Sequence, residues 1–473
     1  MTPIRKVLLL NPPAVGLYIR DQFCSHQSKG TYYWQPLDLL MLSARLHAEG
    51  YELAVVDAVA ERLSFAEAQA RIEQFAPEAI VFLTGSDTFP DDIAFIERAK
   101  RRGVQVAVGI GDILREKGEH LLMKHSAMDA FLTDFVNHGL HAFFDGRLEE
   151  AENMTLRTET EIRKIPARNK KKTFTIPTPR YELFPLHRYR MPYNRHHPYA
   201  TIITSNWCPF QCSFCPFAHT PYKLREVDDV LANLETVRRK GIRQVHFADW
   251  TFAVNRRHAL QILEGMIEAN FGFTWSCLSR VDLMDLELMD LLKRSGCDLI
   301  EFGVECGSQE MLDRYKKDVT LEEIRRAFRW ARQLDLSTLA TFVLGLPGET
   351  LESMEQTLEL ALEIEPTFCS FNVASPRMGT DLRHDMLSDG LIHDEQLSIL
   401  DSSRSDPVFS TPQLSAPELK AFRQHAIRRF YLRPSYLARR LKRLRSWDEL
   451  QNHLGNGVSL IWQSLQRHRV QRT

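Results

Sequence analysis

The chain has 473 residues, 44% hydrophobic and 26% charged, which predicts two or three domains with separate cores. Its formal net charge of −1 excludes an overall electrostatic attraction to nucleic acid. Its eight cysteines are too few for a disulfide framework, so we expect a reducing, cytoplasmic environment.

The first apolar run ends at Asn11-Pro12-Pro13, which is too early for a signal peptide. No stretch approaches the roughly 20 apolar residues that a transmembrane segment needs. We therefore expect no membrane span.

Residues 1–145 alternate short apolar runs with amphipathic segments, a pattern that predicts an α/β domain with a doubly wound parallel sheet of the Rossmann or flavodoxin type. The expected strands are 6–13, 51–58, 78–85, 104–111 and 128–134. Ligands of such sheets bind at the carboxyl ends of the strands. The expected ligand-facing residues are Asn11, Pro13, Thr84, Gly85, Ser86, Gly109 and Gly111, although such residues are also common in ordinary turns.

Residues 146–198 carry six prolines and a lysine run at 170–172, which indicates an extended connector with a solvated basic surface. The alternation of strands and helices resumes at residue 199. It predicts a partial (βα)6 barrel, similar to a smaller TIM barrel, over residues 199–385. The expected strands are 200–205, 244–249, 273–279, 299–305, 338–345 and 368–375.

Residues 386–473 form an expected C-terminal helical region. The part between Lys420 and Arg445 is rich in arginine and has no acidic residue. We favour a helical cap docked on the barrel over a basic amphipathic surface for a membrane or an anionic substrate.

Three cysteines, Cys208, Cys212 and Cys215, follow the first expected barrel strand, where the active site of such a barrel lies. Thiolates bind zinc, copper(I) or iron–sulfur clusters. With His219 they could form a Cys3His zinc site in a non-catalytic binding protein. Alternatively, three thiolates could hold an iron–sulfur cluster and leave one iron open to a substrate or cofactor.

The segment CPFQCSFC (208–215) resembles the CxxxCxxC signature of the radical S-adenosylmethionine (SAM) superfamily, including Phe214 before the third cysteine. Five further segments resemble the cobalamin-binding branch of that superfamily in the same order: HFADWTF (246–252), WSCLSRVD (275–282), GCDLIEFGVECGSQE (296–310), FVLGLPGET (342–350) and SPRMGTDL (375–382). The first domain and the ending FYLRPSYLARRL (430–441) also resemble this branch. The resemblance therefore covers nearly the whole chain.

The resemblance implies that the three cysteines bind a [4Fe-4S] cluster whose open iron is chelated by SAM. Reductive cleavage of SAM would then give a 5′-deoxyadenosyl radical that attacks an unactivated carbon. The resemblance places Asp249 at the SAM amino group, Glu305 near SAM or its ribose, and Ser276 and Arg280 in the same cavity. Each of these also has a structural alternative, such as a turn residue for Asp249 or a buried ion pair for Glu305 and Arg280. The remaining barrel cysteines are expected to be packed hydrophobes.

Two departures concern cobalamin. The first domain lacks the DxHxxG motif that supplies a cobalt-binding histidine, and the last expected strand continues as TDFVNHGLHAFFDG (133–146) instead of a Gly-Glu-rich turn. These departures predict that cobalamin is bound weakly, bound differently, or lost.

Methyl transfer is the expected reaction, and oxidative cyclisation or rearrangement of a porphyrin-like or lipid-like substrate is the alternative. The resemblance further implies a small-molecule substrate and a reductant such as flavodoxin or ferredoxin. The arginine-rich end suggests that the substrate is anionic or membrane-associated and that the enzyme is peripheral at the membrane.

Overall fold

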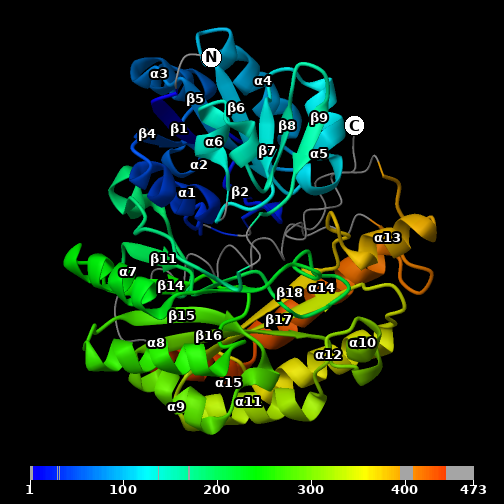
Figure 1. The fold of residues 1–473 in the computed structure, drawn as a ribbon. Helices are drawn as coiled ribbons and strands as arrows, with labels where there is room; N and C mark the ends of the chain where they lie inside the picture. Colours follow the sequence, from blue (N-terminus) through cyan, green and yellow to red (C-terminus); the bar gives the residue numbers. More distant parts are fainter. Residues whose placement is uncertain are drawn as a thin grey trace.

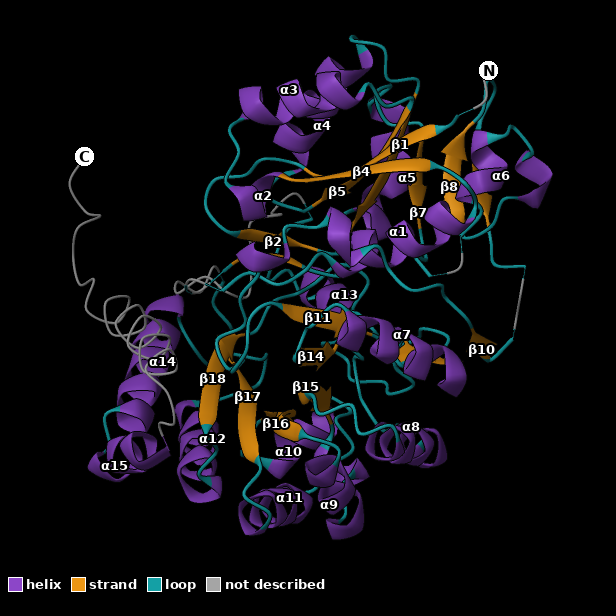
Figure 2. Cartoon of the chain, turned by 90° about the vertical axis from the view of Figure 1, so that its left-hand side faces the viewer, coloured by secondary structure: helices purple, strands orange, loops and turns teal. Residues whose placement is uncertain are grey.

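The computed structural model describes residues 4–28, 30, 32–136, 138–168, 171–394 and 409–443. An N-terminal α/β domain is stacked on a curved sheet with helices on its outer side, and C-terminal helices cover one edge of that sheet (Figures 1 and 2). The carboxyl ends of the N-terminal strands point toward the second sheet (Figure 1).

The N-terminal sheet has the order β4-β1-β5-β6-β7-β8-β9, and its first five members are parallel. These five are the strands predicted from the sequence: β1 (Lys6–Asn11), β4 (Glu52–Asp57), β5 (Ala79–Thr84), β6 (Val106–Gly111) and β7 (Ala130–Leu132). The helices are α1 (Leu37–Ala48), α2 (Ala58–Glu61), α3 (Phe65–Phe75), α4 (Phe89–Lys100), α5 (Leu114–Lys124) and α6 (Leu140–Phe144). Every residue of β5 and β6 is buried, as expected for central strands covered on both faces. The order reverses between β1 and β5, where ligands of doubly wound sheets bind.

The prediction that residues 146–198 form only an extended connector is wrong for its first part. Strands β8 (Met154–Arg157) and β9 (Ile162–Ile165) extend the first sheet, because β8 pairs antiparallel with β7 and β9 pairs antiparallel with β8. Met154, Thr155 and Leu156 are all buried, so this strand is covered on both faces. The later part of the segment contributes only the two-residue strand β10 (Thr173–Phe174) and two short 3-10 helices, Tyr181–Leu183 and Leu186–Arg188.

The second sheet is parallel and has the order β11-β14-β15-β16-β17-β18, which confirms the predicted partial barrel. Its strands are β11 (Tyr199–Ile202), β14 (Gln244–Phe247), β15 (Thr274–Ser279), β16 (Cys297–Glu305), β17 (Ser337–Leu344) and β18 (Phe368–Val373). The helices between them are α7 (Val227–Arg239), α8 (Arg256–Glu268), α9 (Leu286–Arg294), α10 (Gln309–Arg314), α11 (Leu321–Gln333) and α12 (Leu351–Ile364). Along β17 and β18, buried residues alternate with partly exposed ones. The buried face packs on the helices, so the partly exposed face is the concave inner face.

The helices α13 (Asp381–Ser388), α14 (Ala416–Tyr431) and α15 (Pro434–Arg443) follow the last strand. The hydroxyl of Tyr431 donates to the carbonyl of Cys369 on β18 (2.6 Å), and the guanidinium of Arg423 donates to the carbonyl of Phe371 (2.9 Å). These contacts confirm the predicted helical cap for α14, while residues 395–408 and 444–473 of the expected helical region lie outside the described residues. Of the described helices, none has the length and apolar composition needed to cross a bilayer.

Two buried histidines should make the folded protein sensitive to acid. Burial lowers the pKa of His138 to about 3 and that of His246 to about 4, so both are neutral in the folded state and protonate more readily once unfolded. Their contribution to stability is therefore complete above pH 6.5. It is lost as the pH falls below this value, at about 1.4 kcal/mol per pH unit for each histidine.

We expect His138→Asn to flatten the fall of the unfolding free energy between pH 6.5 and 5, since asparagine can keep the acceptor for the Leu140 N–H without titrating. Urea unfolding at several pH values measures this slope. His120→Asn, on the exposed side of α5, should leave the slope unchanged. An unchanged slope in the His138 variant would contradict the prediction.

Candidate functional site

The cysteine loop begins directly after β12 (Ser205–Asn206) at the carboxyl end of the first barrel strand. Cys208 and Cys212 are buried, and Cys215 is partly buried. The loop is fixed from two sides, because the Ser213 N–H donates to the carbonyl of Tyr315 (3.0 Å) and the Ser213 carbonyl accepts from the N–H of Leu382 (2.9 Å). The structure thus brings the three predicted cysteines into one short, anchored loop.

The thiols of this loop influence one another electrostatically. Burial raises the pKa of Cys212 and raises that of Cys215 to about 12, and the charges of the neighbouring cysteines add to both shifts. Lys317 lowers the pKa of both thiols, and Arg280 lowers that of Cys212. Burial therefore favours the protonated form of Cys212 and Cys215, and metal binding to these sulfurs would release their protons.

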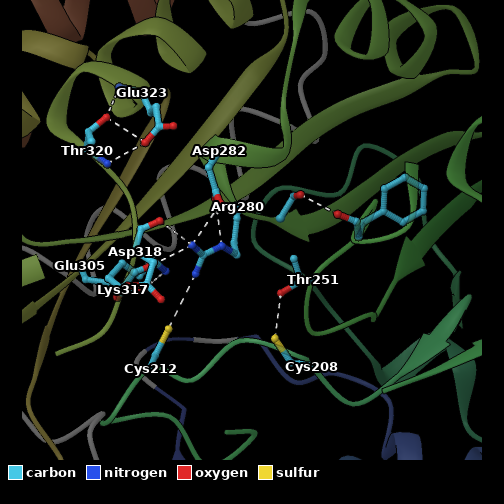
Figure 3. Close-up of polar contacts among 12 residues, drawn as sticks. Cys208, Cys212, Thr251, Arg280, Asp282, Glu305, Lys317, Asp318, Thr320 and Glu323 are labelled. Carbon is cyan, nitrogen blue, oxygen red and sulfur yellow. Dashed lines mark hydrogen bonds and ion pairs between the residues drawn. The ribbon is translucent and has the colours of Figure 1, made fainter. Parts of the chain in front are cut away.

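Figure 3 shows the side chains that contact two of these sulfurs. The Sγ atom of Cys212 accepts from Nη1 of Arg280 (3.8 Å), and the Sγ atom of Cys208 lies 3.5 Å from Oγ1 of Thr251. Hydrogen bonds to cluster sulfurs and nearby charge are the means by which proteins adjust iron–sulfur centres.

The Cys3His zinc alternative is not supported by the geometry. Within the described ranges, no three His, Cys, Asp or Glu side chains are arranged to hold one metal ion. The ring of His219 is largely exposed and lies 3.5 Å from the carboxylate of Asp381. Three thiolates that do not converge on a single ion are suited to a larger group with several metal positions.

Asp249 follows β14, and its side chain reaches the turn that leads from β11 into the cysteine loop. Its carboxylate is fully buried and accepts from the N–H and hydroxyl of Thr204 (both 2.8 Å) and from the hydroxyl of Ser205 (3.0 Å). Asp249 therefore fixes the end of the first barrel strand, which is the turn role that was its structural alternative. A contact with the SAM amino group stays a prediction.

Glu305 and Arg280 lie in one polar cluster beside Cys212 (Figure 3). Glu305 has a positive φ of 68° at the end of β16, and its carboxylate pairs with the ammonium of Lys317 (2.8 Å). Arg280 donates to the carboxylate of Asp282 (2.9 Å) and to the carbonyl of Lys317 (2.7 Å). The sequence analysis missed Lys317, since a lysine in a loop gives no signal without its spatial partner.

The two other predicted SAM residues, Ser276 and Phe214, make their contacts with residues outside this cluster. Ser276 is buried and its hydroxyl contacts Nδ1 of His246 at 3.0 Å. Phe214 is partly buried, and its ring centroid lies 6.4 Å from that of Tyr315.

The N-terminal domain also contributes to the surroundings of the cysteine loop. Phe23 packs against the rings of Trp207 (4.8 Å) and Phe217 (4.4 Å), in a buried cluster that includes Cys208 and contacts Cys215. The guanidinium of Arg115 lies 4.4 Å from the ring of Phe23. Neither residue was predicted, because a single aromatic residue or arginine in a loop or helix start has no distinguishing pattern.

The first turn of α5 joins the two domains. Arg115 donates to the carbonyl of Met378 (3.4 Å), Glu116 accepts from the N–H of Gly379 (2.7 Å) and Lys117 pairs with Asp394. These three consecutive residues therefore dock on the segment that follows β18.

The residues predicted to face cobalamin lie at the carboxyl edge of the first sheet, beneath the hairpin of β2 (Tyr18–Arg20) and β3 (Ser25–Gln27). All of them are buried: Asn11, Pro13, Thr84, Gly85, Ser86, Gly109 and Gly111. Asn11 accepts from Arg20 of the hairpin (2.8 Å), and a Cβ atom on Gly85 would lie only 2.7 Å from Cβ of Ser25. Most of this edge is therefore occupied by the hairpin of the same chain.

Some buried polar atoms between the hairpin and the cysteine loop have no hydrogen-bond partner. These are Oε1 of Gln22, Oγ of Ser86, Nδ2 of Asn206 and Nε1 of Trp207. Buried unpaired donors and acceptors are costly and rare, so their presence indicates a missing partner. The amide side chains around a corrin ring offer both donors and acceptors of the required kind.

Residues 202–361 match the family model of the radical SAM superfamily. An uncharacterized methyltransferase of Pyrococcus horikoshii is 25% identical over 406 residues, which cover 82% of this chain and 84% of that protein.

Two solved structures share the fold over both domains. The radical SAM methyltransferase TsrM from Kitasatospora setae, with cobalamin and a [4Fe-4S] cluster bound, aligns with a TM-score of 0.64 and 19% identity over 82% of this chain and 78% of that chain. The cobalamin-dependent SAM radical enzyme OxsB, with aqua-cobalamin and SAM bound, aligns with a TM-score of 0.70 and 14% identity over 97% of this chain and 72% of that chain.

The three cysteines and four of the six barrel strands, β14 to β17, lie within the matched residues 202–361. Residues 202–361 therefore match a radical SAM domain, and the chain shares the two-domain fold of the TsrM and OxsB structures.

Proposed function

We propose that this protein is a radical SAM enzyme that transfers a methyl group to an unactivated carbon of a small molecule, with cobalamin as the second cofactor. The observation that carries the proposal is the cysteine loop. Its three thiols lie at the carboxyl end of the first barrel strand, do not converge on a single ion, and are flanked by the cations Arg280 and Lys317. This is the donor set and charge that an open [4Fe-4S] cluster requires.

When bound, the cluster supplies an electron that cleaves SAM, and the corrinoid supplies a cobalt centre that carries the methyl group. Cys208, Cys212 and Cys215 would hold three irons of the cluster. Arg280 donates to the Cys212 sulfur and so stabilises negative charge there. The aromatic cluster of Phe23, Trp207 and Phe217 excludes water from the cysteine loop.

SAM would lie beside the cluster, over the polar residues at the carboxyl ends of β15 and β16. Lys317 holds the Glu305 carboxylate in a fixed position through the 2.8 Å ion pair. A carboxylate so placed can accept hydrogen bonds from ribose hydroxyls. Phe214, Asp249, Ser276 and Arg280 remain proposed members of the same site.

The corrinoid would bind between the two domains. Gln22, Ser86, Asn206 and Trp207 supply the unpartnered polar atoms there. Of the strand-end residues predicted from the sequence, Ser86 alone is among these four, because the hairpin uses much of that edge. The similarity to TsrM, described as a methyltransferase with cobalamin bound, favours this arrangement.

Anaerobic reconstitution tests the proposal. We expect about four irons with matching sulfide per chain, formation of 5′-deoxyadenosine from SAM under reducing conditions, and retention of corrinoid after incubation with hydroxocobalamin and gel filtration. Label from the SAM methyl group should appear in the product. Deoxyadenosine without methyl transfer would favour oxidative cyclisation or rearrangement, and one zinc per chain without iron would contradict the proposal.

We also propose a low-potential reductant of the flavodoxin or ferredoxin kind and a cytoplasmic location, because the cluster requires reduction. The idea of an anionic or membrane-associated substrate rested on arginines near the end of the chain. Arg423 and Arg433 of this group donate to main-chain carbonyls of β18 and α12. That docking explains these two arginines without an anionic ligand or a membrane surface.

Arg115 should raise the reduction potential of the bound cluster, because its cationic group lies near Cys215 in a largely buried position. We expect Arg115→Met to lower the potential by several tens of millivolts, about the effect of one charge near 10 Å at an effective dielectric constant of ~20. Redox titration followed by electron paramagnetic resonance measures the shift. Lys124→Met removes a charge from the exposed end of the same helix and should have little effect. Equal potentials in the wild type and the Arg115 variant would contradict this role.

A further inference from the structure

The concave face of the barrel carries one carboxylate that the proposed cofactor sites do not use. Glu301 lies on β16, four residues before Glu305, and both belong to the partly exposed set of that strand. Four strand residues span at most about 13 Å, and a bulge between Gly303 and Glu305 shortens this span. Glu301 therefore lies deeper in the barrel than Glu305.

The neighbouring strands show how unusual this side chain is. Leu278 and Leu339 are the register partners of Glu301 on β15 and β17, so both strand neighbours are apolar. Toward the carboxyl ends, the polar residues on this face of β16 to β18 are satisfied within the protein. Glu305 pairs with Lys317, Thr341 donates to a main-chain carbonyl (3.3 Å), and Ser370 and Asn372 lie 3.2 Å apart.

Glu301 makes no hydrogen bond or ion pair with any residue that the structure describes. Burial and the nearby charge of Glu305 raise the pKa of Glu301 to about 7. A buried carboxylate without a partner is costly in its ionised form, and a cation beside it removes that cost.

A tyrosine from outside the barrel lies near this carboxylate. Tyr193 belongs to the segment between the domains, and it is close enough for the charge of Glu301 to raise the pKa of its hydroxyl further above the ordinary range. Tyr193 also makes no hydrogen bond with a described residue. A carboxylate and a phenol ring without other partners form a suitable site for a protonated amine, through a charged hydrogen bond and a cation–π contact.

We propose that Glu301 and Tyr193 bind an ammonium group of the substrate, so that the substrate class is an amine whose reacting carbon lies about 13 Å or less from its nitrogen. This inference rests on the proposed function, because it assumes that the substrate occupies the barrel beneath SAM. It identifies Glu301 as a specificity-determining residue and predicts a positively charged substrate. Glu301 comes from β16 of the barrel, and Tyr193 comes from the segment that joins the domains.

The test uses the reconstituted full-length protein with SAM bound and three probes of similar shape: 4-phenylbutylammonium, 4-phenylbutanol and 4-phenylbutyrate. Isothermal titration at pH 8 should show the ammonium probe binding at least tenfold more tightly than the alcohol, and the carboxylate binding least. The affinity for the ammonium probe should fall about tenfold between pH 8 and pH 6, as Glu301 becomes protonated.

Glu301→Gln should remove both the preference for the ammonium probe and its pH dependence, while iron content and SAM cleavage stay at the wild-type level. Glu359→Gln removes the same charge from the exposed side of α12 and should bind the probes as the wild type does. Because Glu301→Gln removes an unpaired charge, its thermal midpoint at pH 8 should not be lower than that of the wild type.

Failure of the ammonium probe to bind, equal binding of the alcohol, or an unchanged preference in Glu301→Gln would overturn this inference. A lower thermal midpoint of that variant would also overturn it, since it would show that Glu301 already has a stabilising partner. None of these results affects the proposed function, which is tested separately by iron content and SAM cleavage.

Discussion

Replacing Cys212 by alanine is expected to reduce iron to well below four per chain and deoxyadenosine formation to the level of a control without enzyme. Cys212 is the sulfur that accepts from Arg280, so its loss removes a proposed cluster ligand and leaves the guanidinium without this contact. Iron and sulfide analysis and the absorbance near 420 nm measure the first effect. Chromatography of the SAM products measures the second.

Cys369→Ala is the matched control, because Cys369 is a buried cysteine on β18 outside the loop. It should keep its iron and lose only about 1 kcal/mol of stability through the missing sulfur contacts. Full iron content in Cys212→Ala would show that the loop does not bind the cluster as proposed.

Arg20→Ala should have the largest effect on stability. The Arg20 side chain is fully buried at the switch point of the first sheet, where it pairs with Asp92 (2.8 Å) and donates to Asn11 (2.8 Å) and Thr88 (3.1 Å). Truncation leaves the Asp92 carboxylate buried without its cation, which typically costs about 3–5 kcal/mol. We expect a loss of this size in the unfolding free energy measured with urea and circular dichroism.

Arg98→Ala, on the exposed side of α4, provides the comparison and should change stability by less than about 0.5 kcal/mol. A similarly small change in Arg20→Ala would show that the hairpin is not held by this ion pair. Arg20→Ala also tests the proposed corrinoid site, because Gln22 is part of the hairpin that Arg20 anchors. We expect it to retain less corrinoid after gel filtration.

The regular elements were predictable because their signals are local. Every residue of β5 is buried, which is typical of a central strand covered on both faces. Along β17, buried and partly exposed residues alternate, which is typical of a strand with one partly exposed face. The short strands β8 and β9 were missed, since four residues after a turn give no pattern that separates a strand from a loop. β8 pairs with β7, and β9 pairs with β8. These pairings become apparent only once the edge of the folded sheet is known.

The candidate site divides in the same way. The spacing of Cys208, Cys212 and Cys215 is a local signal, and the structure brings them together. Lys317 and Arg115 act through partners that are distant in sequence, so neither could be identified from its own segment. Asp249 was found by its motif, but its bonds to Thr204 became visible only once the turn was placed.

The docking of α5 has a mechanical consequence. Arg115, Glu116 and Lys117 contact Met378, Gly379 and Asp394 along one segment, and Leu382 of that segment holds the cysteine loop through Ser213. The N-terminal domain and the cysteine loop are therefore both attached to the segment that follows β18. A tilt of the N-terminal domain, for example to admit a bulky macrocycle, would shift the segment after β18 and with it the cysteine loop. Binding of one proposed cofactor would therefore change the position of the residues proposed to bind the other.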